Sequence, residues 1–278
     1  MVFTVSAIGL VVLLAAALVY CIAPGKMSPD AKKTAKHFYG LNCAHRGLHT
    51  EDKKVPENSI AAVKAACSEN YGIELDVQLS KDGKVIVFHD DDLRRICGIN
   101  ERVSSKNWEE LSGMQLLGTN ECIPLLADAL DIIGDTPVVV ELKPAGPNNS
   151  KLCEEVLKVM REHGRRWCIE SFDPRICAWF RKNAPDVLRG QLSRPPRDMI
   201  GVSKITAMLL GYLLTNFISR PHFIAYSNDP NPLAVRLCKA MKPMNVIWTV
   251  LPGHDTEKCE KENDAVIFEF YKPTPRYK

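Results

Sequence analysis

Residues 73–90 read IELDVQLSKDGKVIVFHD, and this stretch decides most of the interpretation of the chain. It predicts a strand, a turn at the Asp-Gly pair and a returning strand, because Asp-Gly favours a two-residue hairpin loop. Side chains alternate along a strand, so Glu74 and Asp76 share one face. With that turn, Asp76 pairs with His89 across the hairpin. Two carboxylates and an imidazole are therefore expected within about 5 Å of one another, which suits a cation beside a proton-transfer group.

The composition is ordinary for a globular enzyme. Of the 278 residues, 46% are hydrophobic and 25% are charged, and the length admits one large domain or two small ones. The net charge of +3 is small and dispersed. No run of Lys and Arg interleaves with aromatic residues, so a nucleic-acid partner is not expected. The composition gives no indication of the oligomeric state.

The N-terminal segment, residues 1–23, carries no charged side chain. As a helix it would span about 33 Å, which is enough for a bilayer core. No basic residue precedes it and no small-x-small site closes it, so we expect a retained transmembrane anchor rather than a cleaved signal. A lysine-bearing linker, residues 24–39, follows. Its lysines predict a single-pass membrane protein with a cytoplasmic catalytic domain, and cysteines without paired spacing agree with that compartment.

Residues 40–278 alternate short apolar runs with helical stretches, which is typical of βαβ units and a parallel sheet. The predicted fold is an α/β TIM (β/α)8 barrel with a small insertion after strand 2, at about residues 90–122. An open doubly wound sheet is the alternative, but no GxGxxG follows the first strand. We interpret the apolar residues 205–218 as one barrel helix, or alternatively as an interfacial segment. The eight expected strands are 41–44, 72–77, 137–142, 167–171, 188–192, 222–226, 245–250 and 265–269.

Polar side chains end the first three of these strands, where barrel enzymes place their active sites. Three are carboxylates within buried strands, which is costly unless a cation compensates them. Oxygen ligands of this kind favour one divalent cation, Mg²⁺ or Ca²⁺, over zinc. The residues expected at this mouth are His45, Arg46, Glu74, Asp76, His89, Glu141 and Lys143.

The remaining residue types at the mouth suit chemistry on a phosphate. His45 ends a strand beside Arg46 and faces His89, so a catalytic role is expected for the imidazoles. Arg46 offers a planar fork for phosphate oxygens, and Lys143 offers a point charge. Trp248 is expected to line the substrate-binding mouth, although an aromatic residue within a strand is also typical of a core.

Six motifs occur in order: AHRG, PENS, IELDVQLSKDG, IVFHDDDL, VELK and WTV. From about Leu41 to the C-terminus the chain resembles the glycerophosphodiester phosphodiesterase family. The resemblance implies a TIM barrel that hydrolyses a glycerophosphodiester to glycerol 3-phosphate and an alcohol. It also implies the roles of three sets of residues: metal ligands Glu74, Asp76 and Glu141, acid and base His45 and His89, and phosphate contacts Arg46 and Lys143.

The family resemblance implies a mechanism in which the neighbouring glycerol hydroxyl attacks phosphorus and water then opens a cyclic phosphate. At the final strand the chain departs from the family pattern, since VIFEFYKP places Glu269 where Asp-x-Pro is common. The substrate is therefore left open between soluble diesters and lysophospholipid-type diesters. Two further alternatives remain: a barrel that binds phospholipid headgroups without turnover, and a lyase that releases the cyclic phosphate.

Overall fold

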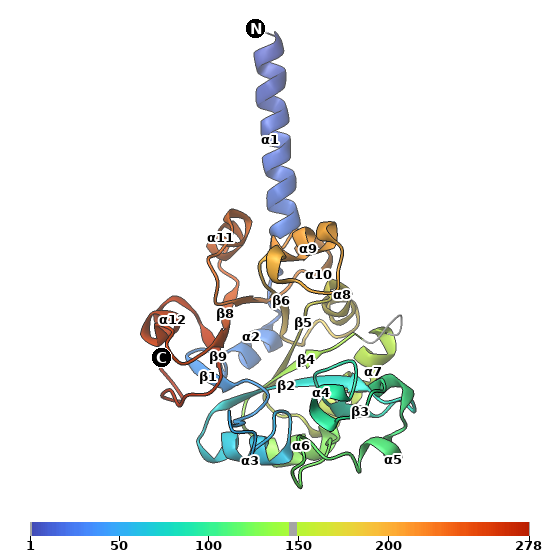
Figure 1. Ribbon diagram of the computed structural model, residues 1–278. Helices are drawn as coiled ribbons and strands as arrows, with labels where there is room; N and C mark the ends of the chain where they lie inside the picture. Colours follow the sequence, from blue (N-terminus) through green and yellow to red (C-terminus); the bar gives the residue numbers. More distant parts are fainter. Residues whose placement is uncertain (1, 145–148, 278) are drawn as a thin grey trace.

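Eight parallel strands close into a barrel within residues 2–144 and 149–277, the part of the chain that the computed structural model describes (Figure 1). The barrel closes where Cys43 pairs with Gly72, so the predicted TIM barrel is confirmed over the open-sheet alternative. The strands, in barrel order, are β1 (Leu41–Ala44), β2 (Gly72–Leu79), β4 (Val138–Leu142), β5 (Trp167–Ser171), β6 (Arg189–Ser193), β7 (Phe223–Ser227), β8 (Met244–Val250) and β9 (Ala265–Phe268).

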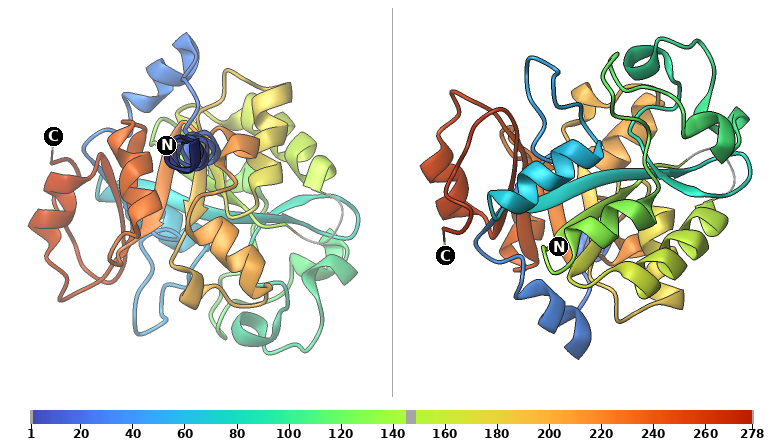
Figure 2. Two further views of the ribbon diagram at one scale, coloured as in Figure 1. Left: turned by 90° about the horizontal axis from the view of Figure 1, so that it is seen from above. Right: turned by 90° about the horizontal axis from the view of Figure 1, so that it is seen from below.

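Helices surround the barrel and bury their apolar faces against the strands (Figure 2). The helix after β5 shows how the sequence sets them: Asp173 caps its first turn, Pro174 begins it, and Ile176 and Phe180 face the core. The helices are α1 (Val2–Ile22), α2 (Pro29–Ala35), α3 (Ile60–Ser68), α4 (Arg94–Cys97), α5 (Trp108–Leu111), α6 (Leu126–Ile133), α7 (Asn149–His163), α8 (Pro174–Asn183), α9 (Lys204–Gly211), α10 (Asn216–Ser219), α11 (Leu233–Ala240) and α12 (Thr256–Glu262).

The barrel interior is apolar at the amino ends of its strands. Leu41, Val139 and Phe223 belong to this inner cluster. Residues 24–39, expected as a polar linker, include α2, whose Ala31 packs into the same cluster. Inward-facing positions recur every second residue along each strand. Those near the carboxyl ends of the strands hold the polar side chains. The fold therefore gathers the charged residues at one mouth.

The hairpin that leaves the barrel pairs β2 with the antiparallel strand β3 (Val85–Val87). Its register differs from the predicted one, since Val77 pairs with Val87 and the amide of Phe88 donates to the carbonyl of Asp76. The expected pairing of Asp76 with His89 was wrong. The loop has three residues and ends in Gly83 at φ +83°, a common hairpin geometry in which glycine supplies the left-handed conformation. His89 lies beyond the last ladder pair, so its direction is not set by strand alternation.

The segment expected as an insertion after strand 2 carries α4 and α5 and lies on the opposite side of the barrel from α12 (Figure 2). It buries apolar side chains of its own against the hairpin. They form a small separate core of Ile86, Phe88, Leu93, Ile96, Val103, Leu111, Leu116 and Ile123.

The N-terminal helix α1 projects from the barrel beside α10 and α11 (Figure 1). In the described part of the chain, no helix combines the length and the apolar character needed to cross a bilayer, and the predicted transmembrane helix is unsupported. The last residue of α1, Ile22, is buried against α10 and α11. The apolar stretch 205–218 is not one helix, because α9 ends near Gly211 and Leu213 adopts a positive φ of 57° before α10.

Candidate active site

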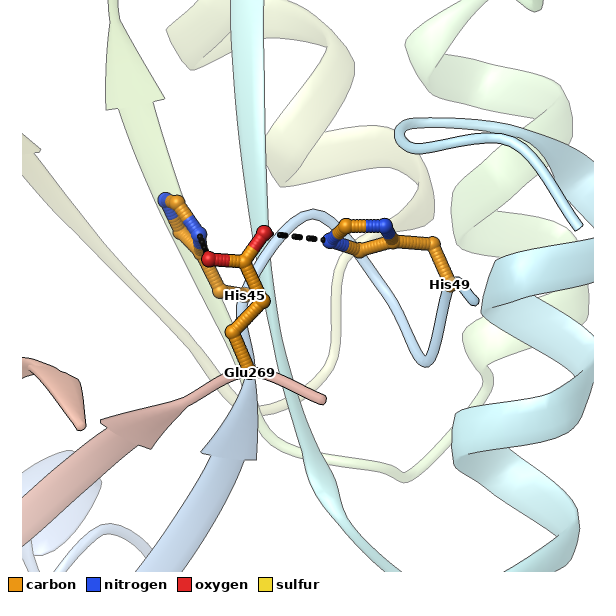
Figure 3. A group of neighbouring side chains, drawn as sticks. All are labelled: His45, His49 and Glu269. Carbon is orange, nitrogen blue, oxygen red and sulfur yellow. Dashed lines mark ion pairs between the residues drawn. The ribbon is translucent and has the colours of Figure 1, made fainter. Parts of the chain in front are cut away.

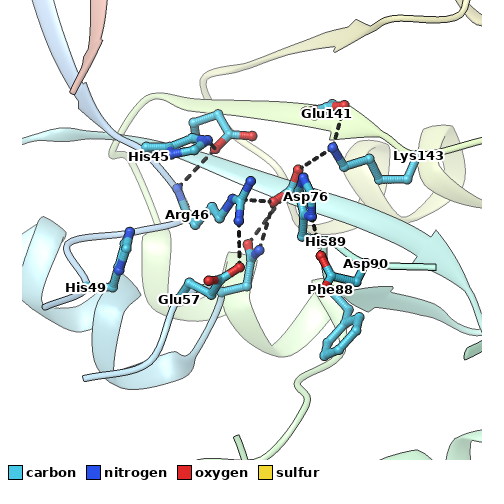
Figure 4. A network of polar contacts seen from close by, with 12 residues as sticks. His45, Arg46, His49, Glu57, Asp76, Phe88, His89, Asp90, Glu141 and Lys143 are labelled. Carbon is cyan, nitrogen blue, oxygen red and sulfur yellow. Dashed lines mark hydrogen bonds and ion pairs between the residues drawn. The ribbon is translucent and has the colours of Figure 1, made fainter. Parts of the chain in front are cut away.

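Three carboxylates from two neighbouring strands lie together at the mouth of the barrel. Figure 4 shows two of them, Asp76 and Glu141, on either side of Lys143. Ligand oxygens of Glu74, Asp76 and Glu141 lie within 4.8 Å of one another, and all three residues are buried. Burial and then the neighbouring negative charges raise the pKa of Glu74 well above its usual value, and burial raises that of Glu141. This group could hold a metal ion.

Two cations lie against Asp76, at the centre of the group. Lys143 Nζ is 3.1 Å from Asp76 Oδ1 and 2.8 Å from Glu141 Oε1. Arg46 Nε is 3.2 Å from Asp76 Oδ2. Burial alone would raise the pKa of Asp76, but Lys143 and Arg46 outweigh it and hold that pKa well below the usual value. Asp76 is therefore ionised at neutral pH.

Glu170 on β5 is a fourth buried carboxylate, which the sequence interpretation missed. Its backbone pairs with that of Glu141, and its side chain lines the same pocket. Its Oε2, like Glu74 Oε1, makes no hydrogen bond to any described residue. Burial raises the pKa of Glu170 well above its usual value, and the charge of Glu141 adds to this. Four buried acids and two partnerless oxygens fit a hard divalent cation. Glu170 was predictable from the sequence, because it lies two residues after Cys168, which faces the barrel interior.

His45 follows β1 and stands between two carboxylates. Its Nε2 is 3.9 Å from Glu74 Oε2, and its Nδ1 is 3.4 Å from Glu269 Oε2. The other oxygen of Glu269 lies 2.8 Å from Nε2 of His49, so Glu269 bridges the two imidazoles (Figure 3). Burial lowers the pKa of His45, although the neighbouring carboxylate of Glu269 works in the opposite direction. The neutral imidazole that results is oriented through Nδ1.

His89 has the same kind of support on the other side of the site. Its Nδ1 is 2.6 Å from Asp90 Oδ1 (Figure 4). Arg95 on α4 binds Asp90 with Nε 2.7 Å from Oδ2. A carboxylate beside Nδ1 fixes the orientation of the ring and leaves Nε2 available for proton transfer. The insertion therefore supports the site, since α4 belongs to it.

The PENS motif supplies a second layer of polar contacts, and its residues were not among the predicted site residues. Glu57 Oε1 is 2.7 Å from Arg46 Nη1, and Arg95 binds the other oxygen of Glu57 at 2.6 Å. Asn58 Nδ2 donates to Asp76 Oδ2 at 2.8 Å. Ser59 caps α3. The motif therefore holds Arg46 and Asp76 in place.

The turn after β1 adopts left-handed backbone conformations at Arg46 and Gly47, with φ of 55° and 76°. Such a conformation in a non-glycine residue persists where the surrounding contacts enforce it, commonly at functional sites. Here it directs the backbone N–H of Arg46 to Glu74 Oε2, at 3.0 Å. The turn thus supplies the one hydrogen bond that the Glu74 side chain accepts in the described chain.

Phe172, Arg194 and Trp248 line the same pocket as His45, His89 and Lys143. They surround a small cavity of about 40 Å³. The structure thus brings together the eight predicted site residues: His45, Arg46, Glu74, Asp76, His89, Glu141, Lys143 and Trp248. Arg194 and Phe172 were not predicted as site residues.

Comparison with known proteins identifies the family. Residues 45–270 match the model of the glycerophosphoryl diester phosphodiesterase family. The chain belongs to this family. A glycerophosphodiester phosphodiesterase of Caldanaerobacter subterraneus is 35% identical over 165 residues, covering 55% of this chain and 66% of that protein. A lysophospholipase D of Rattus norvegicus is 28% identical over 147 residues, covering 48% and 45%. The chain therefore spans about half to two thirds of these relatives.

Solved structures agree on the fold. An Oleispira antarctica phosphodiesterase in complex with the product sn-glycerol-3-phosphate aligns with a TM-score of 0.67 at 21% identity, covering 85% of this chain and 95% of that one. A Thermotoga maritima glycerophosphodiester phosphodiesterase aligns with a TM-score of 0.63 at 24% identity, covering 83% and 94%. At these identities the likeness establishes the barrel alone.

Gly47 lies in a tightly packed turn where a larger side chain is expected to destabilise the fold. A Cβ at position 47 would lie 2.8 Å from the Cβ of Ala62, and the φ of 76° disfavours any side chain. We expect Gly47→Ala to lower the free energy of unfolding by about 1–3 kcal/mol, measured by urea denaturation. Gly113→Ala is the control, because nothing lies within 4 Å of a Cβ there. Equal stability of the two variants would contradict the tight packing of the turn.

Proposed function

We propose that the chain hydrolyses glycerophosphodiesters to glycerol 3-phosphate and an alcohol, with one divalent cation, Mg²⁺ or Ca²⁺. One observation carries the proposal: three buried carboxylates, two cations and two carboxylate-supported imidazoles meet at one end of the barrel. Family membership supports it, as does a relative named glycerophosphodiester phosphodiesterase.

In this proposal, substrate binding divides between a cation site and two basic side chains. Glu74, Asp76 and Glu141 would hold the cation, with hard oxygen ligands on one wall of the mouth. When bound, the cation would supply positive charge to the phosphoryl oxygens. Arg46 and Lys143, already fixed by Asp76, would bind the phosphate from the same side.

We assign the proton transfers to the two imidazoles. His45, kept neutral by burial, accepts the proton of the glycerol hydroxyl as that oxygen attacks phosphorus. His89 donates a proton to the departing alcohol as its bond to phosphorus breaks. Water then opens the cyclic phosphate with the two roles reversed. The neighbouring hydroxyl provides a high effective concentration of nucleophile, which explains why a diester of glycerol suits this site.

Glu269 is expected to act by positioning His45. Glu269→Gln should lower kcat by about 10- to 100-fold, because the imidazolium that forms on proton transfer loses the carboxylate that orients and stabilises it. Loss of the negative charge also lowers the pKa of His45 further, so the acidic limb of the kcat/KM profile should move to lower pH. A pH series on both proteins measures this. Glu69→Gln, in a surface ion pair with Lys272, is the control. An unmoved acidic limb would refute the positioning role.

The experiment that tests the function is a product analysis with glycerophosphocholine and lysophosphatidylcholine as substrates. We expect glycerol 3-phosphate and choline in equal amounts from the first, activity lost with chelator, and recovery with Mg²⁺ or Ca²⁺. A cyclic phosphate as the end product would indicate the lyase. Binding without any product would indicate a non-catalytic barrel. Activity indifferent to chelation would contradict the cation site.

We also propose that α1 attaches the chain to a membrane, with the barrel on the cytoplasmic side. Ile8 and Leu13 on α1 are 66% and 69% exposed, and residues 2–23 carry no charge. Ile205 on α9 and Leu233 on α11, 73% and 67% exposed, belong to helices near the base of α1 (Figure 1). These surfaces also support lysophospholipids as the second candidate substrates, as do four relatives named lysophospholipase D.

Membrane attachment predicts that the full chain sediments with phosphatidylcholine–phosphatidylglycerol vesicles. Deletion of residues 2–17 should abolish sedimentation, because the apolar surface is lost, while the buried end of α1 at Ile22 remains. Circular dichroism provides the control that the shortened barrel is folded. If the full chain stays in the supernatant, or the shortened chain still sediments, attachment through α1 is wrong.

A further inference from the structure

Arg194 follows β6 and points into the mouth from the side opposite His45 and Arg46. Leu192, two residues earlier, belongs to the inner cluster of the barrel, and Arg194 continues this inward series into the pocket. The strand orders β1-β2-β4-β5-β6 and β1-β9-β8-β7-β6 place β6 across the barrel from β1. A phosphodiester bound at Arg46 therefore extends one of its two substituents toward Arg194.

Two aromatic rings hold the Arg194 guanidinium. Its central carbon is 4.9 Å from the ring centroid of Phe172 and 5.1 Å from that of Trp248. The two rings meet edge to face with centroids 5.6 Å apart, and Trp248 Nε1 donates to the carbonyl of Ala225 at 3.2 Å, which fixes the indole. A pair of aromatic rings at a substrate pocket would otherwise suit a quaternary ammonium ion. Here Arg194 already occupies that position.

Arg194 differs from the other cations of the pocket in forming no ion pair with a described residue. Arg46 is bound by Asp76 and Glu57, and Lys143 by Asp76 and Glu141. Among residues 2–144 and 149–277, none forms a hydrogen bond or ion pair with the Arg194 side chain, which contacts the two rings. The carboxylates of Glu141, Asp198 and Asp229 act on it only from beyond ion-pair distance. A half-buried guanidinium with free donors is a ready site for an anion.

We infer that Arg194, stacked on Phe172 and Trp248, forms a subsite that selects diesters whose headgroup carries negative charge and disfavours quaternary ammonium headgroups. The inference rests on the proposed function and names the substrate class of the same site. A second phosphate on the headgroup would receive the free guanidinium donors. A choline group would meet a positive charge where it needs an aromatic face.

The test compares glycerophosphoinositol 4-phosphate, glycerophosphoglycerol and glycerophosphocholine, whose headgroups are anionic, neutral and cationic. For the wild-type chain we expect kcat/KM for the anionic diester to exceed that for glycerophosphocholine by about tenfold or more, because Arg194 attracts the anionic headgroup and repels the cationic one. Arg194→Met, which keeps the apolar stem, should reduce this ratio to about one, mainly through the KM of the anionic diester. The neutral diester should change little.

Matched variants separate the subsite from a general loss of structure. Arg194→Lys keeps the charge and should retain part of the preference. Arg161→Gln, at an exposed residue of α7 paired with Asp186, should leave the ratio unchanged. A ratio equal in the wild type and in Arg194→Met would overturn the inference, as would a wild-type preference for glycerophosphocholine.

A binding measurement distinguishes failure of the inference from failure of the proposed function. Calorimetric titration of glycerophosphoinositol 4-phosphate into chelator-treated protein requires no turnover. We expect binding about tenfold weaker in Arg194→Met than in the wild type. Equal binding by both proteins would overturn the subsite whether or not the wild type hydrolyses any diester. Absence of turnover with this difference in binding would count against the proposed function alone.

Discussion

His45→Ala and His89→Ala are each expected to lower kcat by about 10²- to 10⁴-fold, the usual contribution of a positioned acid or base. Each removes one partner of the proposed proton transfers, and the carboxylate behind each ring, Glu269 or Asp90, cannot reach the same position. Steady-state hydrolysis of a glycerophosphodiester, with saturating cation, measures the effect. The double variant should lose little more than either single one, because the two rings act as a unit.

The control for these variants is His163→Ala. His163 lies on α7 with its Nδ1 2.8 Å from Asp131, outside the barrel mouth. Its replacement should leave kcat within about twofold. Turnover unchanged in both His45→Ala and His89→Ala would remove the acid–base assignment, and a large loss in only one of them would restrict it to that residue.

Asp76→Asn is expected to have the largest combined effect on stability and activity. The substitution keeps the shape but removes the charge that balances Lys143 and Arg46, and breaking a buried ion pair costs about 3–5 kcal/mol. Glu141 and Glu57 still pair with these cations, so we expect the lower end of that range. Activity should fall by at least about 10²-fold, because phosphate contacts and a cation ligand are lost together.

Urea denaturation and kinetics below the midpoint of unfolding separate the two losses. Asp131→Asn, in the surface pair with His163, should change stability by less than about 0.5 kcal/mol. Retention of wild-type stability by Asp76→Asn would show that Asp76 does not balance the two cations. Retention of activity would show that its carboxylate is not needed at the site.

The barrel strands were predictable because a parallel strand buried on both faces reads as a continuous apolar run. The run VVVEL at β4 is an example, and Glu141 stands out within it. The parallel barrel also predicted that the polar residues would lie together, because inward-facing residues at the carboxyl ends of parallel strands all line one mouth. The alternation of inward positions would also have indicated Glu170 and Arg194, had it been followed beyond the first three strands.

Other features depend on contacts that sequence patterns do not encode. The hairpin has three loop residues because Asp82 accepts from Ser80 Oγ and from the amide of Trp108 in the insertion. The helix expected at 205–218 breaks where Gly211 packs against Pro196, a contact from the preceding loop. The support of His45 by Glu269 joins the first and last strands of the barrel. Contacts of this kind join residues far apart in the sequence and form only when the barrel closes.

The central claim is that Glu74, Asp76 and Glu141 hold the cation. The most direct measurement is an anomalous difference map of a crystal grown with Mn²⁺, which substitutes for Mg²⁺ at oxygen ligands. We predict one strong peak among these three carboxylates. A second group could also hold a metal, formed by His45, His49 and Glu269. A peak at that group, with none at the three carboxylates, would contradict the account.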